Sequence, residues 1–144
     1  MFPSDAKILI VDDSNFARTM LKNSLRELKF WKILEAADAK TAHALMIEDE
    51  QKKDPVQLVI VDIHMPEVNG LMLLKWIREQ EATKTMPVII VTSSQEKNEI
   101  LEAGKLGASH YVVKPFDMKT LKEKMISTWQ KHGQKFAEGL RRPG

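Results

Sequence analysis

Five short hydrophobic segments recur along this 144-residue chain, separated by longer stretches of mixed polarity. They are rich in Ile and Val and show no polar alternation: Ile8–Val11, Ile33–Leu34, Leu58–Val61, Val88–Val91 and Tyr111–Val113. Continuous apolar runs of this length are typical of strands that are buried on both faces, as in a parallel sheet covered by helices. The pattern therefore predicts five buried parallel strands.

Each strand is followed by apolar residues at helical spacing. Between Ser14 and Leu28 these residues form one face of a helix, and Ser14 is a suitable N-cap. Similar stripes run through Ala42–Met46, Leu71–Ile77, Ile100–Leu106 and Leu121–Trp129. Because crossovers between parallel strands are right-handed, five such units predict a doubly wound α/β sheet with helices on both faces.

Polar residues follow the predicted strands at the edge where such sheets bind ligands. Asp12 and Asp13 follow the first strand, Asp62 the third, Thr92 the fourth and Lys114 the fifth. Three carboxylates at one edge repel one another, and an all-oxygen cluster of this kind suits Mg²⁺. A metal, a hydroxyl and an ammonium group together can position and neutralise a phosphoryl group.

Each of these residues also has an ordinary structural explanation. Asp13 could cap the first helix, Thr92 could cap the fourth, and Lys114 could be a solvated loop residue. These explanations do not account for the coincidence of acids, hydroxyl and ammonium at the same edge of four strands. We therefore interpret the set as a phosphoryl site.

Composition narrows the function further. The 22 Lys and Arg residues nearly balance 20 Asp and Glu, and a net charge of +2, spread along the chain, does not favour nucleic acid or an anionic membrane as partner. There is no cysteine, which excludes thiolate chemistry and suits a reducing compartment. No apolar run approaches the ~20 residues of a membrane span, and the first residues lack the features of a secretory signal. We expect a cytoplasmic protein with one domain over residues 1–133 and a flexible C-terminal tail over residues 134–144.

The motifs at the strand ends resemble those of the receiver domain of two-component response regulators, most of all the single-domain chemotaxis receivers of the CheY type. The resemblance covers residues 5–132 and is carried by Ile10–Ser14, Val61–Pro66 with Gly70, Val91–Thr92 and Gly107–Phe116. It implies a flavodoxin-like sheet with strand order 2-1-3-4-5. It also implies a signalling protein rather than an enzyme in the usual sense.

The resemblance implies a role for each matched residue. Asp62 would accept the phosphoryl group, and Asp12, Asp13, Asp62 and the backbone carbonyl of His64 would hold Mg²⁺, Asp12 largely through water. Lys114 would pair with the phosphoryl group. Thr92 would be drawn in to bind a phosphoryl oxygen, and Tyr111 would turn into the space that Thr92 leaves.

The same resemblance implies the partners. They would be a CheA-like histidine kinase, a phosphatase, and the flagellar motor switch protein or another target that binds the phosphorylated form. The output face would comprise the fourth helix, the fifth strand and the fifth helix. Because 144 residues leave no room for an effector domain, we expect a stand-alone receiver that signals by being bound.

One residue departs from the pattern, since His64 stands where close chemotaxis relatives often have a small polar residue such as Asn. Its imidazole could line the path of the hydrolytic water and tune the phosphoryl lifetime. Alternatively, the side chain is merely exposed and only the backbone matters.

Two other functions are consistent with part of the pattern. A small haloacid-dehalogenase-like phosphohydrolase also uses an Asp nucleophile, but its motif places one residue between the two acids, whereas Asp12 and Asp13 are adjacent. A receiver could instead act as a phosphorelay intermediate that returns its phosphoryl group to another histidine protein. The sequence does not distinguish this role from direct output.

Overall fold

The five strands form one parallel sheet in the computed structural model, which describes residues 1–140 of the chain. The strands are β1 (Lys7–Val11), β2 (Ile33–Ala36), β3 (Val56–Val61), β4 (Val88–Thr92) and β5 (His110–Val113). Their order is β2-β1-β3-β4-β5, and each adjacent pair is parallel. The prediction of a doubly wound sheet with order 2-1-3-4-5 is confirmed.

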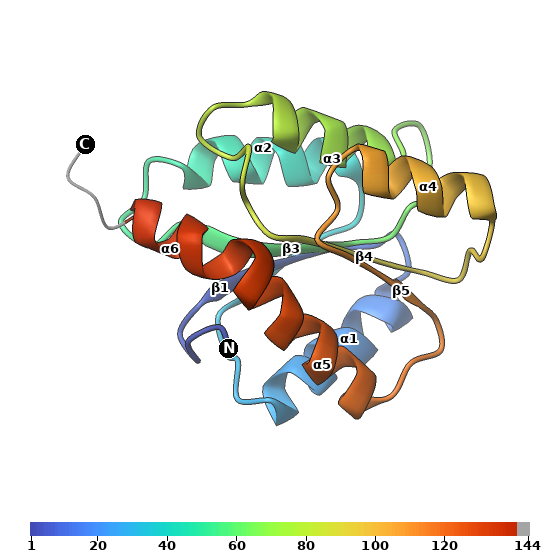
Figure 1. The fold of residues 1–144 in the computed structure, drawn as a ribbon, viewed down its shortest axis with the longest axis horizontal. Helices are drawn as coiled ribbons and strands as arrows, with labels where there is room; N and C mark the ends of the chain where they lie inside the picture. The colour runs from blue at the N-terminus through green and yellow to red at the C-terminus, as the bar shows by residue number, and fades with distance from the viewer. Residues whose placement is uncertain (141–144) are drawn as a thin grey trace.

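Helices cover both faces of this sheet, as Figure 1 shows. They are α1 (Asn15–Glu27), α2 (Ala39–Asp49), α3 (Gly70–Glu79), α4 (Lys97–Lys105) and α5 (Met118–Thr128). In Figure 1, α2, α3 and α4 lie above the sheet, and α1 and α5 lie below it. Side-chain caps fix the start of four of them, because Ser14, Asp38, Asn69 and Asp117 each accept a hydrogen bond from a first-turn amide.

The hydrophobic core consists of two clusters, one on each face of the sheet. β1, β3 and β4 are buried almost throughout, so their side chains enter the two clusters alternately. Leu9, Val59 and Ile90 belong to the cluster beneath α2 and α3, whereas Ile8, Ile60 and Ile89 belong to the cluster that α1 and α5 cover. This two-sided burial explains why the strand sequences show no polar alternation.

The C-terminal segment corrects one expectation. We expected a flexible tail from residue 134, but the chain continues from α5 through one π-helical turn, Trp129–Gly133, into a further helix, α6 (Gln134–Leu140). Figure 1 shows α6 at the end of the sheet where the strands begin. Phe136 and Ala137 of α6 are buried, and Phe136 joins a core cluster, so burial of apolar surface holds this helix in place. The part of the expected tail at residues 141–144 lies outside the described residues.

None of the helices described over residues 1–140 is both long enough and apolar enough to cross a lipid bilayer. The strands end at the edge of the sheet that lies at the right of Figure 1, and the residues predicted to form the phosphoryl site follow them there.

Candidate functional site

The sheet places three of the predicted site residues through backbone hydrogen bonds. The amide of Asp12 donates to the carbonyl of Ala36 (3.1 Å), and the amide of Asp62 donates to the carbonyl of Val11 (2.9 Å). The amide of Lys114 donates to the carbonyl of Thr92 (2.8 Å). Each bond continues the ladder by one step beyond a strand, so these side chains emerge from a rigid edge.

The three acids form one cluster. Oxygen atoms from the carboxylates of Asp12, Asp13 and Asp62 all lie within 4.8 Å of one another. Asp12 is buried, Asp62 is half-buried and Asp13 is exposed, so the cluster opens from the sheet edge to solvent. Three carboxylate oxygens at this spacing, with room for water on the open side, suit a hard divalent cation such as Mg²⁺.

Lys114 provides the positive charge of the site. Its Nζ lies 2.7 Å from Oδ2 of Asp12 and 3.4 Å from Oδ2 of Asp62. Burial opposes the charge of this ammonium group, but the hydrogen bond to Asp12 and the charges of Asp62 and Asp12 outweigh burial and raise the pKa of Lys114. Lys114 is thus held protonated, and three carboxylates against one ammonium leave an excess of negative charge that a cation would neutralise.

Arg18 of α1 binds the backbone beside the acid cluster, and no motif in the sequence indicates this role. Its Nη1 donates to the backbone carbonyl of Asp12 (2.6 Å) and its Nη2 to Oδ1 of Asn15 (3.1 Å), while its Nε contacts Glu35 of β2 (3.3 Å). The hydrogen bond from Lys22, opposed by burial and supported by Arg18, lowers the pKa of Glu35. This pairing gives Glu35 a structural role, which its position at the end of β2 did not reveal.

Thr92 and Tyr111 lie beside the acid cluster, in a separate set of hydrogen bonds. Thr92 is fully buried, and its Oγ1 accepts a hydrogen bond from the amide of Ser94 (3.4 Å). The hydroxyl of Tyr111 donates to the carbonyl of Ser94 (2.9 Å). Within residues 1–140 no hydrogen bond joins Thr92 to the acids, so the connection between β4 and α4 links Thr92 to Tyr111 but not directly to Asp62.

The His64 side chain is exposed, yet it has a defined partner. Its Nε2 lies 3.0 Å from Oε1 of Glu99 on α4, and its backbone amide donates to Oδ1 of Asp62 (3.4 Å). The simple alternative of an unengaged side chain is therefore incomplete, because the imidazole bridges the β3–α3 connection and α4.

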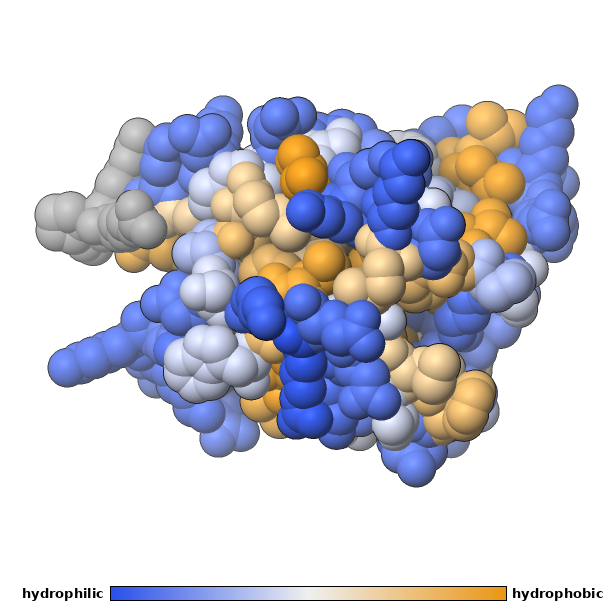
Figure 2. Space-filling model, turned by 90° about the horizontal axis from the view of Figure 1, so that it is seen from below, coloured by the Kyte–Doolittle hydropathy of each residue, from blue (hydrophilic) through white to orange (hydrophobic). Residues whose placement is uncertain are grey.

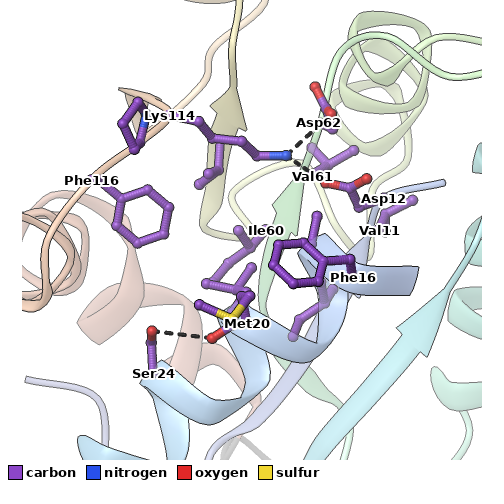
Figure 3. Close-up of a pocket in the computed structure, with 15 residues that line it drawn as sticks. Val11, Asp12, Phe16, Met20, Ser24, Ile60, Val61, Asp62, Lys114 and Phe116 are labelled. Carbon is purple, nitrogen blue, oxygen red and sulfur yellow. Dashed lines mark hydrogen bonds and ion pairs between the residues drawn. The ribbon is translucent and has the colours of Figure 1, made fainter. Parts of the chain in front are cut away.

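An apolar groove of about 300 Å³ opens next to the acids, between α1 and the β5–α5 connection. Figure 3 shows Phe16 and Phe116 on opposite sides of this space, with Met20 below them and Lys114 reaching across to Asp12 and Asp62. Phe16 and Met20 are 74% and 53% exposed, which is unusual for side chains of this size. Figure 2, which views the face covered by α1 and α5, shows hydrophobic side chains at the surface among the charged ones.

Comparison with known proteins identifies relatives of this architecture. A family model described as "Response regulator receiver domain" matches residues 8–126. The chain is 40% identical over 125 residues to Chemotaxis protein CheY-3 of Vibrio cholerae, covering 87% of this chain and 92% of that protein. It is also 40% identical over 119 residues to a Chemotaxis protein CheY homolog of Campylobacter jejuni, covering 83% and 88%.

Solved structures agree with this result. The structure of Vibrio cholerae chemotaxis protein CheY4 superposes with a TM-score of 0.76 at 28% identity, over 86% of this chain and 98% of that one. A putative response regulator from Chloroflexus aurantiacus superposes with a TM-score of 0.78 at 25% identity, over 88% and 98%.

Proposed function

This chain belongs to the response regulator receiver family, and we propose that it is a stand-alone, Mg²⁺-dependent phosphoacceptor that signals by binding a partner when phosphorylated. The observation that carries the proposal is the constellation of Asp12, Asp13 and Asp62 around Lys114, at the carboxyl ends of three strands. The match to chemotaxis proteins over most of both chains supports a role in control of the flagellar motor. The expected location is the cytoplasm, where a histidine kinase would supply the phosphoryl group.

The chemistry follows from the positions of the side chains. A carboxylate oxygen of Asp62 attacks the phosphorus of a phosphohistidine; the new O–P bond replaces the N–P bond, and the departing imidazole takes up a proton. Asp12, Asp13, Asp62 and the backbone carbonyl of His64 would hold Mg²⁺, which when bound neutralises phosphoryl oxygens. Lys114, already 3.4 Å from Asp62, would pair with the phosphoryl group.

Thr92 and Tyr111 are the proposed switch. A phosphoryl group adds a charge near −2 and new acceptor oxygens beside the end of β4. Movement of the Thr92 hydroxyl toward such an oxygen would break its bond with the Ser94 amide, and Ser94 also holds Tyr111. The change would therefore reach the proposed output face formed by α4, β5 and α5.

The groove between Phe16, Met20 and Phe116 supports a protein phosphodonor. An exposed apolar patch that borders a reactive carboxylate suits a helix that presents its phosphohistidine to Asp62. A CheA-like kinase is the proposed donor. A motor switch protein is the proposed target.

Labelling with acetyl phosphate and Mg²⁺, followed by intact-mass measurement, tests the assignment. We expect one phosphoryl adduct in the natural protein, none in Asp62→Asn, and a normal adduct in the control Asp5→Asn, which changes an exposed aspartate away from the site. An adduct that persists in Asp62→Asn would refute the role of Asp62. Steady hydrolysis of many phosphoesters would instead favour the phosphohydrolase, and transfer of the phosphoryl group to a second histidine protein would favour the phosphorelay.

A further inference from the structure

A chain of hydrogen bonds joins the phosphoacceptor loop to α4. His64, two residues after Asp62, places its Nε2 3.0 Å from Oε1 of Glu99. The hydroxyl of Ser94 donates to the same carboxylate oxygen of Glu99. Glu99 therefore binds two connections at once, β3–α3 through His64 and β4–α4 through Ser94.

Ser94 is the centre of the second connection. Its hydroxyl accepts a hydrogen bond from the amide of Glu96 (3.2 Å), its amide donates to Oγ1 of Thr92, and its carbonyl accepts from Tyr111. Both proposed switch residues thus contact Ser94 directly. Within residues 1–140 no hydrogen bond joins Glu99 to either of them, so the hydrogen-bonded link from Glu99 to both runs through Ser94.

The position of Glu99 differs from that of the other acids on and next to α4. Its side chain is 17% exposed, whereas Glu96 and Glu102 are exposed residues. Hydrogen bonds to a carboxylate are stronger than those between neutral groups. Two such bonds from separate loops to one half-buried carboxylate form a defined bridge, unlike a solvated surface charge.

We propose that Glu99 is a positioning residue for the phosphorylation site, acting through His64 and Ser94. It holds the imidazole of His64 toward α4 and away from the phosphoryl group on Asp62, which leaves the path of the hydrolytic water open. This inference rests on the proposed function, because it concerns the lifetime of the phosphoryl group on Asp62. The neutral imidazole with a proton on Nε2 suffices, so no change of protonation is required.

The test is the decay rate of the phosphorylated protein after the phosphodonor is removed, measured by intact mass. Without Glu99 the imidazole turns to the phosphoryl oxygens and excludes water, so Glu99→Ala should slow decay by about fivefold or more, the lower range of coupling between linked sites. Glu99→Gln, which keeps an acceptor for both donors, should restore most of the natural rate. Glu102→Ala changes an exposed acid on the same helix whose side chain forms no hydrogen bond or ion pair within residues 1–140, and it should match the natural protein.

A double-mutant cycle with His64→Ala separates positioning from a general structural effect. If Glu99 acts through His64, Glu99→Ala should change the decay rate by less than about twofold in the His64→Ala background. The ¹⁵N signal of Nε2 of His64 should also shift in Glu99→Ala and stay in place in Glu102→Ala. If Glu99→Ala does not fold, Glu99→Ser, whose side chain is too short to reach His64, completes the same comparison.

The outcomes distinguish failure of the proposed function from failure of the role of Glu99. Absence of any adduct in the natural protein would remove the proposed function itself. Normal labelling with an unchanged decay rate in Glu99→Ala, or equal slowing with and without His64, would overturn only the role of Glu99.

Discussion

Gly70 offers a sharp test of how Asp62, the proposed phosphoacceptor, is held in place. It is the first residue of α3, and its amide donates to the carbonyl of Ile63 (2.8 Å). A Cβ atom added here would lie 2.0 Å from the carbonyl oxygen of Asp62 and 2.9 Å from its carbonyl carbon. The closest atoms are backbone atoms of Asp62 itself, so no side-chain rotation relieves the contact.

The size of the effect follows from these distances. Carbon and oxygen normally approach to about 3.3 Å, so Gly70→Ala requires a backbone shift of roughly 1.3 Å. Overpacking of a buried site typically costs about 1–3 kcal/mol, and we expect at least the upper end here because the contact is with backbone. The free energy of unfolding should therefore fall by about 3 kcal/mol or more in urea titrations. Folded Gly70→Ala should also accept a phosphoryl group poorly, since Asp62 is displaced.

Gly104 provides the matched control. It lies within α4 and is exposed, and within residues 1–140 no heavy atom outside its chain neighbours and its own helix backbone lies within 4 Å of the position that a Cβ would occupy. Gly104→Ala should stabilise the protein by about 0.5–1 kcal/mol through helix propensity. Both variants replace Gly with Ala, but Gly70→Ala should lower the free energy of unfolding whereas Gly104→Ala should raise it. A Gly70→Ala protein with an unfolding free energy within about 1 kcal/mol of the natural value, and with normal labelling, would refute this account of the loop.

Two further predictions concern the C-terminal segment. Phe136→Ala should lower the free energy of unfolding by about 3 kcal/mol, because a buried aromatic side chain is lost. The control Lys135→Ala changes an exposed neighbour and should alter the free energy of unfolding little. Equal effects of the two variants in urea titrations would show that α6 is not packed. His132, whose Nδ1 pairs with the Ser109 hydroxyl (2.7 Å), has a pKa lowered mainly by burial and then by the positive charges of Arg78, Lys131 and His110. His132 therefore binds a proton more readily in the unfolded chain than in the folded protein. The contribution of the neutral imidazole to the free energy of unfolding is thus present above the ordinary pKa of 6.5 and is lost as the pH falls below it. Between about pH 7 and 5 the natural protein should lose stability faster than His132→Gln; parallel curves from urea titrations would contradict this.

The sequence predicted the scaffold well because its signals are local. A buried parallel strand shows itself as a continuous run of Ile and Val, and a cap such as Ser14 precedes its helix directly. The strand-end rule then predicts Asp12, Asp62 and Lys114 together from sequence alone, since parallel strands finish at one edge. These inferences need only a short stretch of sequence and a known sheet geometry.

Pairings between distant residues could not be predicted in this way. His64 and Glu99 are 35 positions apart, and nothing in the sequence around either residue indicates that they are partners. Asp49 lies in a charged stretch that reads as solvated, yet it is buried against Lys7 and the amide of Val56. A buried, paired acid can lie in the same kind of charged stretch as a surface acid, so only the tertiary arrangement distinguishes them.

The site divides into a rigid half and a half that is held less firmly, and this division suits a switch. Asp12, Asp62 and Lys114 continue the ladders of the sheet, so a charge placed there meets fixed neighbours. The connection to α4 is different, because α4 has no side-chain N-cap, and individual hydrogen bonds through Ser94 and Glu99 join this connection to its neighbours. New phosphoryl oxygens compete for individual hydrogen bonds, and these are easier to exchange than a strand of a buried sheet. The response to phosphorylation should therefore appear first at the β4–α4 connection, while the sheet edge stays in place.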